Sequence, residues 1–378
     1  MNNALIIGGS KGLGHSLAIN LSNMNYNNIY ILDKNPPDTN IPNSKYYQFD
    51  VIKDDYNILT KFYNINTLII TIGIGRLASF ETFHDIEIQK TLQINTISVI
   101  RIIKFFYNKL KYDKIFFCSL VSSISGIVSS PLFSIYAASK SALYRFSESI
   151  NIELEKEKSN NRILNICPGY LEGTSFYNKN SDYKKLDYTS KEILNSIFNR
   201  NTIYIPDYED IYKDIINNYC KDNYKFGLES YDYKINSNRI NTKQSCKIGY
   251  LSGTFDLFHI GHLNIIRKAK EYCDYLIVGV HKDAAHKGKK VFIPFKERCD
   301  IIKNIKYVDY VIVSKAEDCD VYEDYKFDFL FVGSDYKGSE RFRRYEDFFK
   351  DKNVKIIYLP YTKKTSSTKL RNILDKFA

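Results

Sequence analysis

The 378-residue sequence contains no tryptophan, an absence that fits its bias toward Asn, Ile, Lys and Tyr and says little about function. No apolar run reaches the roughly 20 residues that a membrane-spanning helix needs. The N-terminus passes straight into an apolar segment and lacks the basic start of a signal peptide. The seven cysteines are odd in number and form no Cys-x-x-Cys pair, which argues against a disulfide framework or a zinc site. We therefore expect a cytoplasmic protein without a membrane span.

The net charge of +11 is not gathered in a basic arm or stripe, because acidic residues are dispersed among the basic ones. Proteins that bind nucleic acid usually carry such a stripe, so the charge favours small anionic substrates and no nucleic-acid partner. The sequence also shows no carboxylate cluster that would hold a metal ion by itself, so no dedicated metal site is predicted.

Short apolar runs alternate with helical patterns in two successive parts of the chain. This alternation predicts an α/β protein with two Rossmann-like domains, each a mostly parallel sheet with helices on both faces. A polar, aperiodic stretch over 226–246 predicts a linker between domains at 1–225 and 247–378. The expected strands are 4–7, 28–32, 68–71, 114–118, 163–166 and 202–205 in the first domain, and 247–251, 275–280, 310–313, 329–332 and 355–359 in the second.

Three glycines follow the first expected strand as Gly-x-x-x-Gly-x-Gly and lead into a helical segment. Gly8, Gly12 and Gly14 allow a tight turn and a close approach of the backbone to a pyrophosphate at the helix N-terminus. Asp33 closes the second strand, 19 residues after Gly14, where a carboxylate can bond the ribose hydroxyls of an adenosine. The pattern predicts a dinucleotide site.

Tyr136 and Lys140 form a Tyr-x-x-x-Lys pair one helical turn apart, and Ser123 precedes the tyrosine by 13 residues. Addition of hydride to a carbonyl needs a proton for the developing alkoxide. A phenol has a pKa of about 10, so a neighbouring ammonium must lower that pKa before the phenol can donate near neutrality. Lys140 is expected to do this and to bond the nicotinamide ribose, while Ser123 holds the carbonyl oxygen.

In order and spacing these residues resemble the short-chain dehydrogenase/reductase family, over about residues 1–225. The resemblance implies an NAD(P)-binding domain and adds Asn95 as a fourth catalytic residue, which supports a water relay to Lys140. The cofactor contacts that it implies are Gly8, Lys11, Gly12, Leu13, Gly14, Asp33, Asp50, Gly73, Pro168 and Gly169.

Two departures from the family pattern fall at structural positions, and the choice of cofactor stays open. Ile7 stands where the family usually has threonine, and Ile70-Thr71-Ile72-Gly73 replaces Asn-Asn-Ala-Gly. Asp33 favours NAD, whereas Lys11 and Lys34 can pair with the 2′-phosphate of NADP. A biosynthetic reduction would draw on NADP(H), which gives NADP a slight preference over NAD.

Residues 253–262 read Gly-Thr-Phe-Asp-Leu-Phe-His-Ile-Gly-His, between an apolar strand and a helical segment. His259 and His262 are three residues apart on the first helical turn and face the same way. Unpaired backbone N–H groups and the positive helix end attract phosphate at this position. The segment therefore predicts nucleotidyl transfer, in which charge builds on an α-phosphate and a leaving pyrophosphate.

This segment and five others, at 278–280, 294–298, 305–309, 333–336 and 365–369, resemble the His-x-Gly-His cytidylyltransferases, especially those acting on glycerol 3-phosphate. The resemblance covers about residues 247–378. It implies that His259 and His262 stabilise the α-phosphate and the leaving pyrophosphate. The nucleotide contacts that it implies are Gly253, Thr254, Phe255, Lys287, Arg298, Asp335, Ser366, Ser367 and Thr368.

The resemblance leaves three points open. Relatives carry Arg-Thr where this chain has Tyr361-Thr362, and Lys363 or Lys364 can replace the missing guanidinium only as a less directional charge. Mg²⁺ is expected on the triphosphate of CTP rather than in a protein site. Adenylyltransferases for heptose phosphates share the motif, so another nucleotide remains an alternative to CTP.

Two sites on one chain suggest consecutive steps. The leading hypothesis is reduction of a ketose phosphate, with ribulose 5-phosphate the best fit, followed by transfer of CMP to give CDP-ribitol for a surface polysaccharide. CDP-glycerol formation, reduction of a nucleotide-linked ketose, and a catalytically inactive nucleotide-sensing scaffold are the alternatives. A homo-oligomer, dimer or tetramer, is expected.

Overall fold

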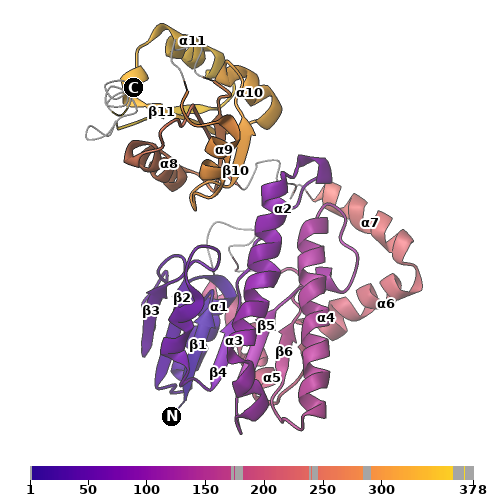
Figure 1. The fold of residues 1–378 in the computed structure, drawn as a ribbon. Coiled ribbons are helices and arrows are strands. Elements are labelled where there is room, and N and C mark those ends of the chain that lie inside the picture. The colour runs from indigo at the N-terminus through magenta and orange to yellow at the C-terminus, as the bar shows by residue number, and fades with distance from the viewer. Residues whose placement is uncertain are drawn as a thin grey trace. The chain divides into compact units, whose positions relative to one another are not determined.

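The computed structural model describes residues 2–171, 174, 182–237, 240, 246–283, 291–360 and 370. The chain divides into two compact units, Met1–Lys243 and Gln244–Ala378, each built on its own parallel sheet (Figure 1). The predicted α/β class with two Rossmann-like units is confirmed. Within the described residues, no helix combines the length and the apolar character needed to cross a membrane.

The sheet of the first unit has seven parallel strands in the order β3-β2-β1-β4-β5-β6-β7. β1 and β4 are aliphatic and almost wholly buried, as parallel strands covered by helices on both faces must be. The strands are β1 (Asn3–Ile7), β2 (Asn28–Asp33), β3 (Ser44–Gln48), β4 (Thr67–Ile70), β5 (Phe117–Val121), β6 (Ile163–Ile166) and β7 (Ile203–Tyr204).

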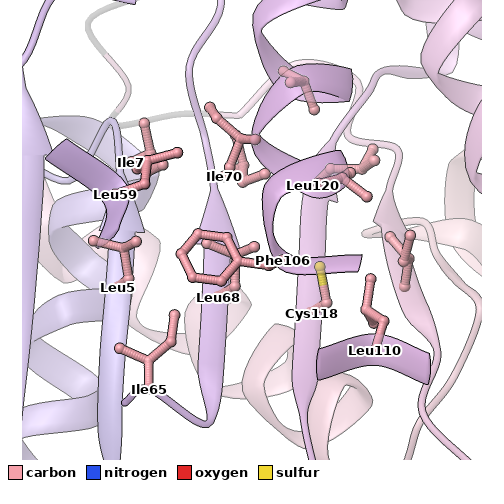
Figure 2. Packing of buried hydrophobic residues seen from close by; sticks show 14 of the residues in the cluster. Leu5, Ile7, Leu59, Ile65, Leu68, Ile70, Phe106, Leu110, Cys118 and Leu120 are labelled. Carbon is pink, nitrogen blue, oxygen red and sulfur yellow. The ribbon is translucent and has the colours of Figure 1, made fainter. Parts of the chain in front are cut away.

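Helices cover both faces of this sheet, and alternate strand residues supply the two cores. The helices are α1 (Gly12–Asn23), α2 (Asp85–Leu92), α3 (Ser98–Tyr112), α4 (Ser134–Lys156), α5 (Tyr183–Phe198), α6 (Lys213–Lys221) and α7 (Asn223–Asn236). α1 and α5 pack on the face that carries Ala4 and Ile6, whereas α3 and α4 pack on the face of Leu5 and Ile7. Figure 2 shows the core on the face of Leu5 and Ile7, where side chains from β1, β4 and β5 meet Phe106 of α3.

The second unit has five parallel strands in the order β10-β9-β8-β11-β12. The strands are β8 (Ile248–Gly253), β9 (Tyr275–Val280), β10 (Tyr310–Val313), β11 (Phe329–Gly333) and β12 (Lys355–Leu359). The helices are α8 (Ile260–Tyr272), α9 (Phe295–Lys303), α10 (Asp318–Tyr325) and α11 (Glu340–Phe349). α8 and α9 cover one face, and α10 and α11 cover the other.

Three expectations about the elements are corrected by the structure. The expected strand at 114–118 lies instead at Phe117–Val121, because this segment is the one that pairs with β4 and β6. β3 was not expected; it is a half-exposed edge strand without a continuous apolar run. The stretch at 226–246 is not a linker throughout, since α7 occupies it as far as Asn236.

The polar sequence of α7 is stabilised by contacts that its hydropathy does not reveal. The carboxylate of Asp222 caps the helix by accepting the Lys225 N–H at 2.9 Å. The Lys234 ammonium donates to Ser130 Oγ at 2.6 Å and to the Pro131 carbonyl at 3.0 Å. α6 and α7 thus form a helical pair beside α4 (Figure 1), and the first unit continues beyond the predicted boundary at 225.

Candidate active sites

The predicted dinucleotide loop lies where the strand order of the first sheet reverses, between β1 and β4. Ligands of open α/β sheets bind at such a point, outside the carboxyl ends of the strands. Gly8 follows β1 directly and has a φ of +92°, and its N–H donates to the Leu32 carbonyl at 2.9 Å. A Cβ on residue 14 would lie 2.3 Å from the Gly8 carbonyl oxygen, so only glycine lets α1 start this close to the turn.

Thr71 accounts for both departures from the family pattern at this turn. Its hydroxyl donates to the Gly8 carbonyl at 2.9 Å and sits against the position where Gly14 lacks a side chain. The threonine that directly follows β4 thereby holds the loop, where the Ile7 side chain has no hydroxyl to do so. The first amides of α1 lie at the carboxyl edge of the sheet, and no side chain of Gly12 or Gly14 covers them. This cradle fits a pyrophosphate.

The polar residues around the adenosine end are engaged with the backbone. Oδ2 of Asp33 accepts the Ser10 N–H at 3.0 Å, and Oδ1 accepts the Lys34 N–H at 2.7 Å. Asp50 Oδ1 accepts the Ile52 N–H at 2.9 Å. Lys34 and Asp50 both line a cavity of about 850 Å³ beside β2 and β3. The structure therefore brings these predicted residues to one edge of the sheet.

Asn95 is held at a break in the helical ladder. It lies in the π-helical turn Gln93–Ile97, which joins α2 to α3, and such turns often occur at functional sites. Its Oδ1 accepts the Ile74 N–H at 2.8 Å, and its Nδ2 donates to Ser139 Oγ at 2.9 Å. Ser139, which no motif singled out, donates in turn to the Tyr136 carbonyl at 2.6 Å. Asn95 is thereby tied to the helix that carries Tyr136 and Lys140.

Tyr136 and Lys140 lie on α4, and Lys140 is buried. The Lys140 ammonium donates to the Val121 carbonyl at 2.8 Å and lies 5.6 Å from the centre of the Tyr136 ring. A Cβ on residue 73 would be 3.1 Å from Lys140 Nζ, so Gly73 leaves the room that this side chain occupies. Desolvation lowers the pKa of Lys140 to about 7, which makes its charge sensitive to nearby anions.

The pKa of Lys140 predicts how cofactor affinity depends on pH. The ammonium is populated below about pH 7 and lost above it. We expect NADH affinity to fall with rising pH, approaching about tenfold per pH unit once the neutral amine predominates. NADH is the better probe because it lacks the phosphate monoester whose own titration near pH 6 would interfere. Fluorescence titration of NADH measures the effect. Lys140→Met should bind NADH more weakly with a flat profile, and an equal slope in this variant would contradict the assignment.

Ser123 and the Pro168-Gly169 turn lie together at the ends of β5 and β6. Ser123 Oγ donates to the Pro168 carbonyl at 3.2 Å and accepts the Ser125 N–H at 3.2 Å. Tyr212, which no motif indicated, reaches this turn from 42 residues away: its hydroxyl accepts the Tyr170 N–H at 3.1 Å. The local sequence could not predict this contact, because Tyr212 lies in the π-helical turn Tyr208–Tyr212 after β7 and meets Tyr170 only in the folded chain.

In the second unit the His-x-Gly-His segment begins at the end of β8, between β9 and β11. Here too the strand order reverses, so the segment lies at the edge of the sheet where ligands of such folds bind. His259 is the N-cap of α8 rather than a residue of its first turn, and its Nδ1 accepts the Gly261 N–H at 3.0 Å. The neutral ring then carries its proton on Nε2, which can donate to a phosphate.

The two imidazoles form a stack whose centres are 4.0 Å apart. Burial lowers the pKa of His259, so its ring stays neutral at neutral pH. Phe255 is buried and has a φ of +53°. Its ring and that of His262 form a T-shaped pair with centres 5.4 Å apart. Leu257 also has a positive φ, of +49°. Two strained residues in one loop are typical of a functional site.

Thr254 offers a further polar atom in this loop. Its Oγ1 is buried and has no hydrogen-bond partner in the part of the chain that the structure describes. A buried hydroxyl without a partner is costly unless a ligand or water satisfies it. The donor set of this loop, which combines the Thr254 hydroxyl, the Nε2–H of His259 and the α8 N-terminus, therefore fits a phosphate.

Arg298 occupies a different place from the one predicted. Its side chain is 1% exposed. The guanidinium donates to the carbonyl oxygens of Thr254, His281, Lys282 and Ile293. These contacts join the ends of β8 and β9 to the start of α9, so the contacts of Arg298 in the structure are structural. Its contact with phosphate stays a prediction. His281, whose carbonyl is one of these acceptors, is 9% exposed.

Removal of the Arg298 guanidinium should destabilise the second unit. Arg298→Ala leaves four carbonyl groups without their donor, and we expect a loss of about 3 kcal/mol or more in the free energy of unfolding of that unit. Calorimetry or hydrogen exchange measures it. The exposed Arg344→Ala is the matched control, with an expected change within about 0.5 kcal/mol. Equal stability of the two variants, with CTP affinity lost only in Arg298→Ala, would instead assign Arg298 to phosphate binding.

The remaining predicted contacts divide into two groups. Gly253 ends β8, and Asp335 follows β11 in the short helix Ser334–Tyr336, so both lie at the carboxyl ends of neighbouring strands. The Asp335 carboxylate folds back toward Gly333, where a Cβ would lie 2.3 Å from its Oδ1. The other contacts, which lie outside the described residues, are Lys287, Ser366, Ser367 and Thr368.

The first site has the groups for carbonyl reduction. A bound nicotinamide dinucleotide would supply the hydride. Tyr136 can donate the proton, the charge of Lys140 can favour its transfer, and Ser123 can hold the carbonyl oxygen. The second site needs no protein nucleophile, because an acceptor phosphate can attack CTP directly. Its imidazoles and helix N-terminus can stabilise the charge that develops on the α-phosphate.

Comparison with known proteins agrees with this division. A short chain dehydrogenase model matches residues 2–184, and a cytidylyltransferase-like model matches residues 250–373. The chain is 36% identical over 126 residues to glycerol-3-phosphate cytidylyltransferase of Staphylococcus aureus, covering 32% of this chain and 90% of that protein. It is also 36% identical over 123 residues to the Bacillus subtilis protein of the same name, with the same shares covered.

A solved structure resembles the first unit in fold. It is a short chain dehydrogenase from Burkholderia cenocepacia in complex with NADP, with a TM-score of 0.52 and 18% identity over 61% of this chain and 97% of that one.

Fold, sites and comparisons together define a two-domain enzyme that pairs an oxidoreductase with a nucleotidyltransferase. The chain belongs to the cytidylyltransferase-like family through its second unit, which is fused to an N-terminal short-chain dehydrogenase domain.

Proposed function

We propose that the enzyme reduces a ketose phosphate and then transfers CMP from CTP to the resulting polyol phosphate, forming a CDP-alditol. Ribulose 5-phosphate and CDP-ribitol are the proposed substrate and product. The observation that carries the proposal is the fusion itself: a short-chain dehydrogenase domain and a cytidylyltransferase-like domain occur on one chain. The fusion of a reductase to the transferase is explained if the reductase makes the polyol phosphate that accepts CMP.

The relatives named for glycerol 3-phosphate support a phosphorylated polyol as the acceptor. Glycerol 3-phosphate itself is usually supplied by separate metabolism, which would leave the fused reductase unexplained. CDP-glycerol is therefore the second candidate. Reduction after nucleotidyl transfer, on a CDP-ketose, is the third.

For cofactors we propose NADP(H), with Mg²⁺ accompanying CTP. The Burkholderia relative contains NADP, and Lys11 and Lys34 provide positive charge near the end of β2. Mg²⁺ is assigned to the triphosphate of CTP, because this hard cation commonly binds substrate phosphates. We further propose that the enzyme works in the cytoplasm, where CTP and NADPH are available, and that its product feeds a surface polysaccharide. A homo-oligomer remains a prediction.

A panel of acceptors tests the proposal. The full-length enzyme, given CTP and Mg²⁺, is offered ribitol 5-phosphate, glycerol 3-phosphate and heptose phosphates, and the CDP products are separated by chromatography. Ribitol 5-phosphate should have the highest kcat/KM. Equal or faster reaction of glycerol 3-phosphate would contradict the ribitol assignment. Tight binding of NADPH and CTP without turnover on any acceptor would support the inactive scaffold instead.

A further inference from the structure

Lys11, the basic side chain of the glycine loop, is already paired with a carboxylate of its own unit. It is the N-cap residue of α1, and its ammonium lies 3.4 Å from Oδ1 of Asp38. Asp38 belongs to the loop between β2 and β3, and its N–H donates to the Ser10 carbonyl at 3.3 Å. The ion pair therefore joins this loop to the dinucleotide turn, beside the end of β2.

The Asp38 carboxylate is positioned from its other side as well. Its Oδ2 accepts a hydrogen bond of 2.9 Å from the hydroxyl of Tyr183, the first residue of α5. The Tyr183 ring packs on His15 of α1 with ring centres 4.5 Å apart. His15 is fully buried, and its Nε2 is 2.8 Å from the hydroxyl of Thr39. A buried ring thus supports the tyrosine that holds the carboxylate in place.

Asp33, the residue expected to choose between the cofactors, is held in place by the backbone around it. Each of its carboxylate oxygens accepts a backbone N–H, from Ser10 and from Lys34. These bonds fix Asp33 as a support of the glycine turn. The charge that a 2′-phosphate would meet at Lys11 depends in addition on Asp38, which contacts Lys11.

We propose that Asp38 sets the discrimination between NADPH and NADH, because it occupies Lys11 in the place of the 2′-phosphate. The inference rests on the proposed reductase function. When NADPH binds, its 2′-phosphate must replace the Asp38 carboxylate as the partner of Lys11. The displaced carboxylate then stays near the phosphate, which carries the same sign of charge. NADH has no 2′-phosphate and leaves the ion pair intact. The two side chains are 52% and 37% exposed, a setting in which an ion pair is weak and exchange costs little. The enzyme therefore accepts both nucleotides, and the Asp38 carboxylate reduces its preference for NADPH.

Removal of the charge at residue 38 should increase the preference for NADPH. Asp38→Asn keeps the size of the side chain and an acceptor for the Tyr183 hydroxyl. We expect the dissociation constant of NADPH to fall about two- to fivefold and that of NADH to stay unchanged. In a Lys11→Met background the same substitution should change NADPH affinity by less than about twofold, because the competed cation is gone. Calorimetric or fluorescence titration of the full-length chain measures all four variants with both nucleotides.

Asp113→Asn is the matched control. Asp113 forms an ion pair with Lys109 and is 38% exposed, but it follows α3 at the amino edge of the sheet, away from the dinucleotide loop. It should leave discrimination unchanged. Equal effects of Asp38→Asn on both nucleotides, or an undiminished gain in the Lys11→Met background, would overturn the inference alone. Failure of the unaltered chain to bind either nucleotide would contradict the proposed reductase function and the inference with it.

Discussion

Tyr136→Phe is expected to lower carbonyl reduction by about 10³-fold while cytidylyl transfer to a preformed polyol phosphate changes by less than about twofold. The substitution removes only the hydroxyl that donates the proton. The phenyl ring can keep its place, because Tyr136 stacks on Phe133 with ring centres 4.2 Å apart and an interplanar angle of 18°. The loss should therefore appear in kcat rather than in cofactor affinity or stability.

Two assays on the same preparation separate the steps. Oxidation of NADPH with ribulose 5-phosphate reports reduction, and release of pyrophosphate from CTP with ribitol 5-phosphate reports transfer. Ser139→Ala is a useful companion variant, since the buried Ser139 hydroxyl bonds both Asn95 and the Tyr136 carbonyl. It should reduce the rate less than Tyr136→Phe does. Reduction that survives in Tyr136→Phe would show that another group donates the proton.

His259→Asn is expected to lower cytidylyl transfer by about 10²- to 10³-fold and to leave reduction unchanged. Asparagine can still accept the Gly261 N–H as an N-cap, so α8 keeps its cap, which is worth about 1 kcal/mol. What disappears is the Nε2–H that we expect to donate to the phosphate. His259→Ala removes both the cap and the donor, and the difference between the two variants isolates the cost of the cap.

The pH dependence of transfer follows from the burial of His259. Because burial lowers its pKa, the ring becomes protonated only below its usual titration range. The neutral Nε2–H donor should therefore persist through neutral pH, with any change confined to the acidic side. Equal activity of wild type and His259→Asn would contradict the assignment of this imidazole to the reacting phosphate.

Local patterns were enough to predict most of this molecule. Continuous apolar runs located the expected strands at 163–166, 275–280, 310–313 and 355–359 as the structure has them. The glycine spacing and the His-x-Gly-His segment predicted the two turns that lead into α1 and α8, because each pattern depends on a turn followed at once by a helix. Residues that act through contacts between distant segments carried no such signal.

Arg298 shows why sequence patterns could not predict every residue's role. An arginine in a transferase motif predicts a phosphate contact, yet its four carbonyl partners come from segments that meet only after folding. Tyr212 and Ser139 escaped prediction for the same reason. Asp38 is an ordinary polar loop residue in the sequence, and its contacts with Lys11 and with Tyr183, 145 residues away, become visible only in the folded chain.

The central claim is that one chain reduces a ketose phosphate and passes the product to CTP. The most direct measurement uses NADPH deuterated at both C4 positions, together with ribulose 5-phosphate, CTP and Mg²⁺, and analyses the nucleotide products by mass spectrometry. The account predicts CDP-ribitol one mass unit heavier than its unlabelled form, and none when NADPH is omitted. A CDP-linked ketose that forms without NADPH, or a CDP-alditol without deuterium, would contradict it.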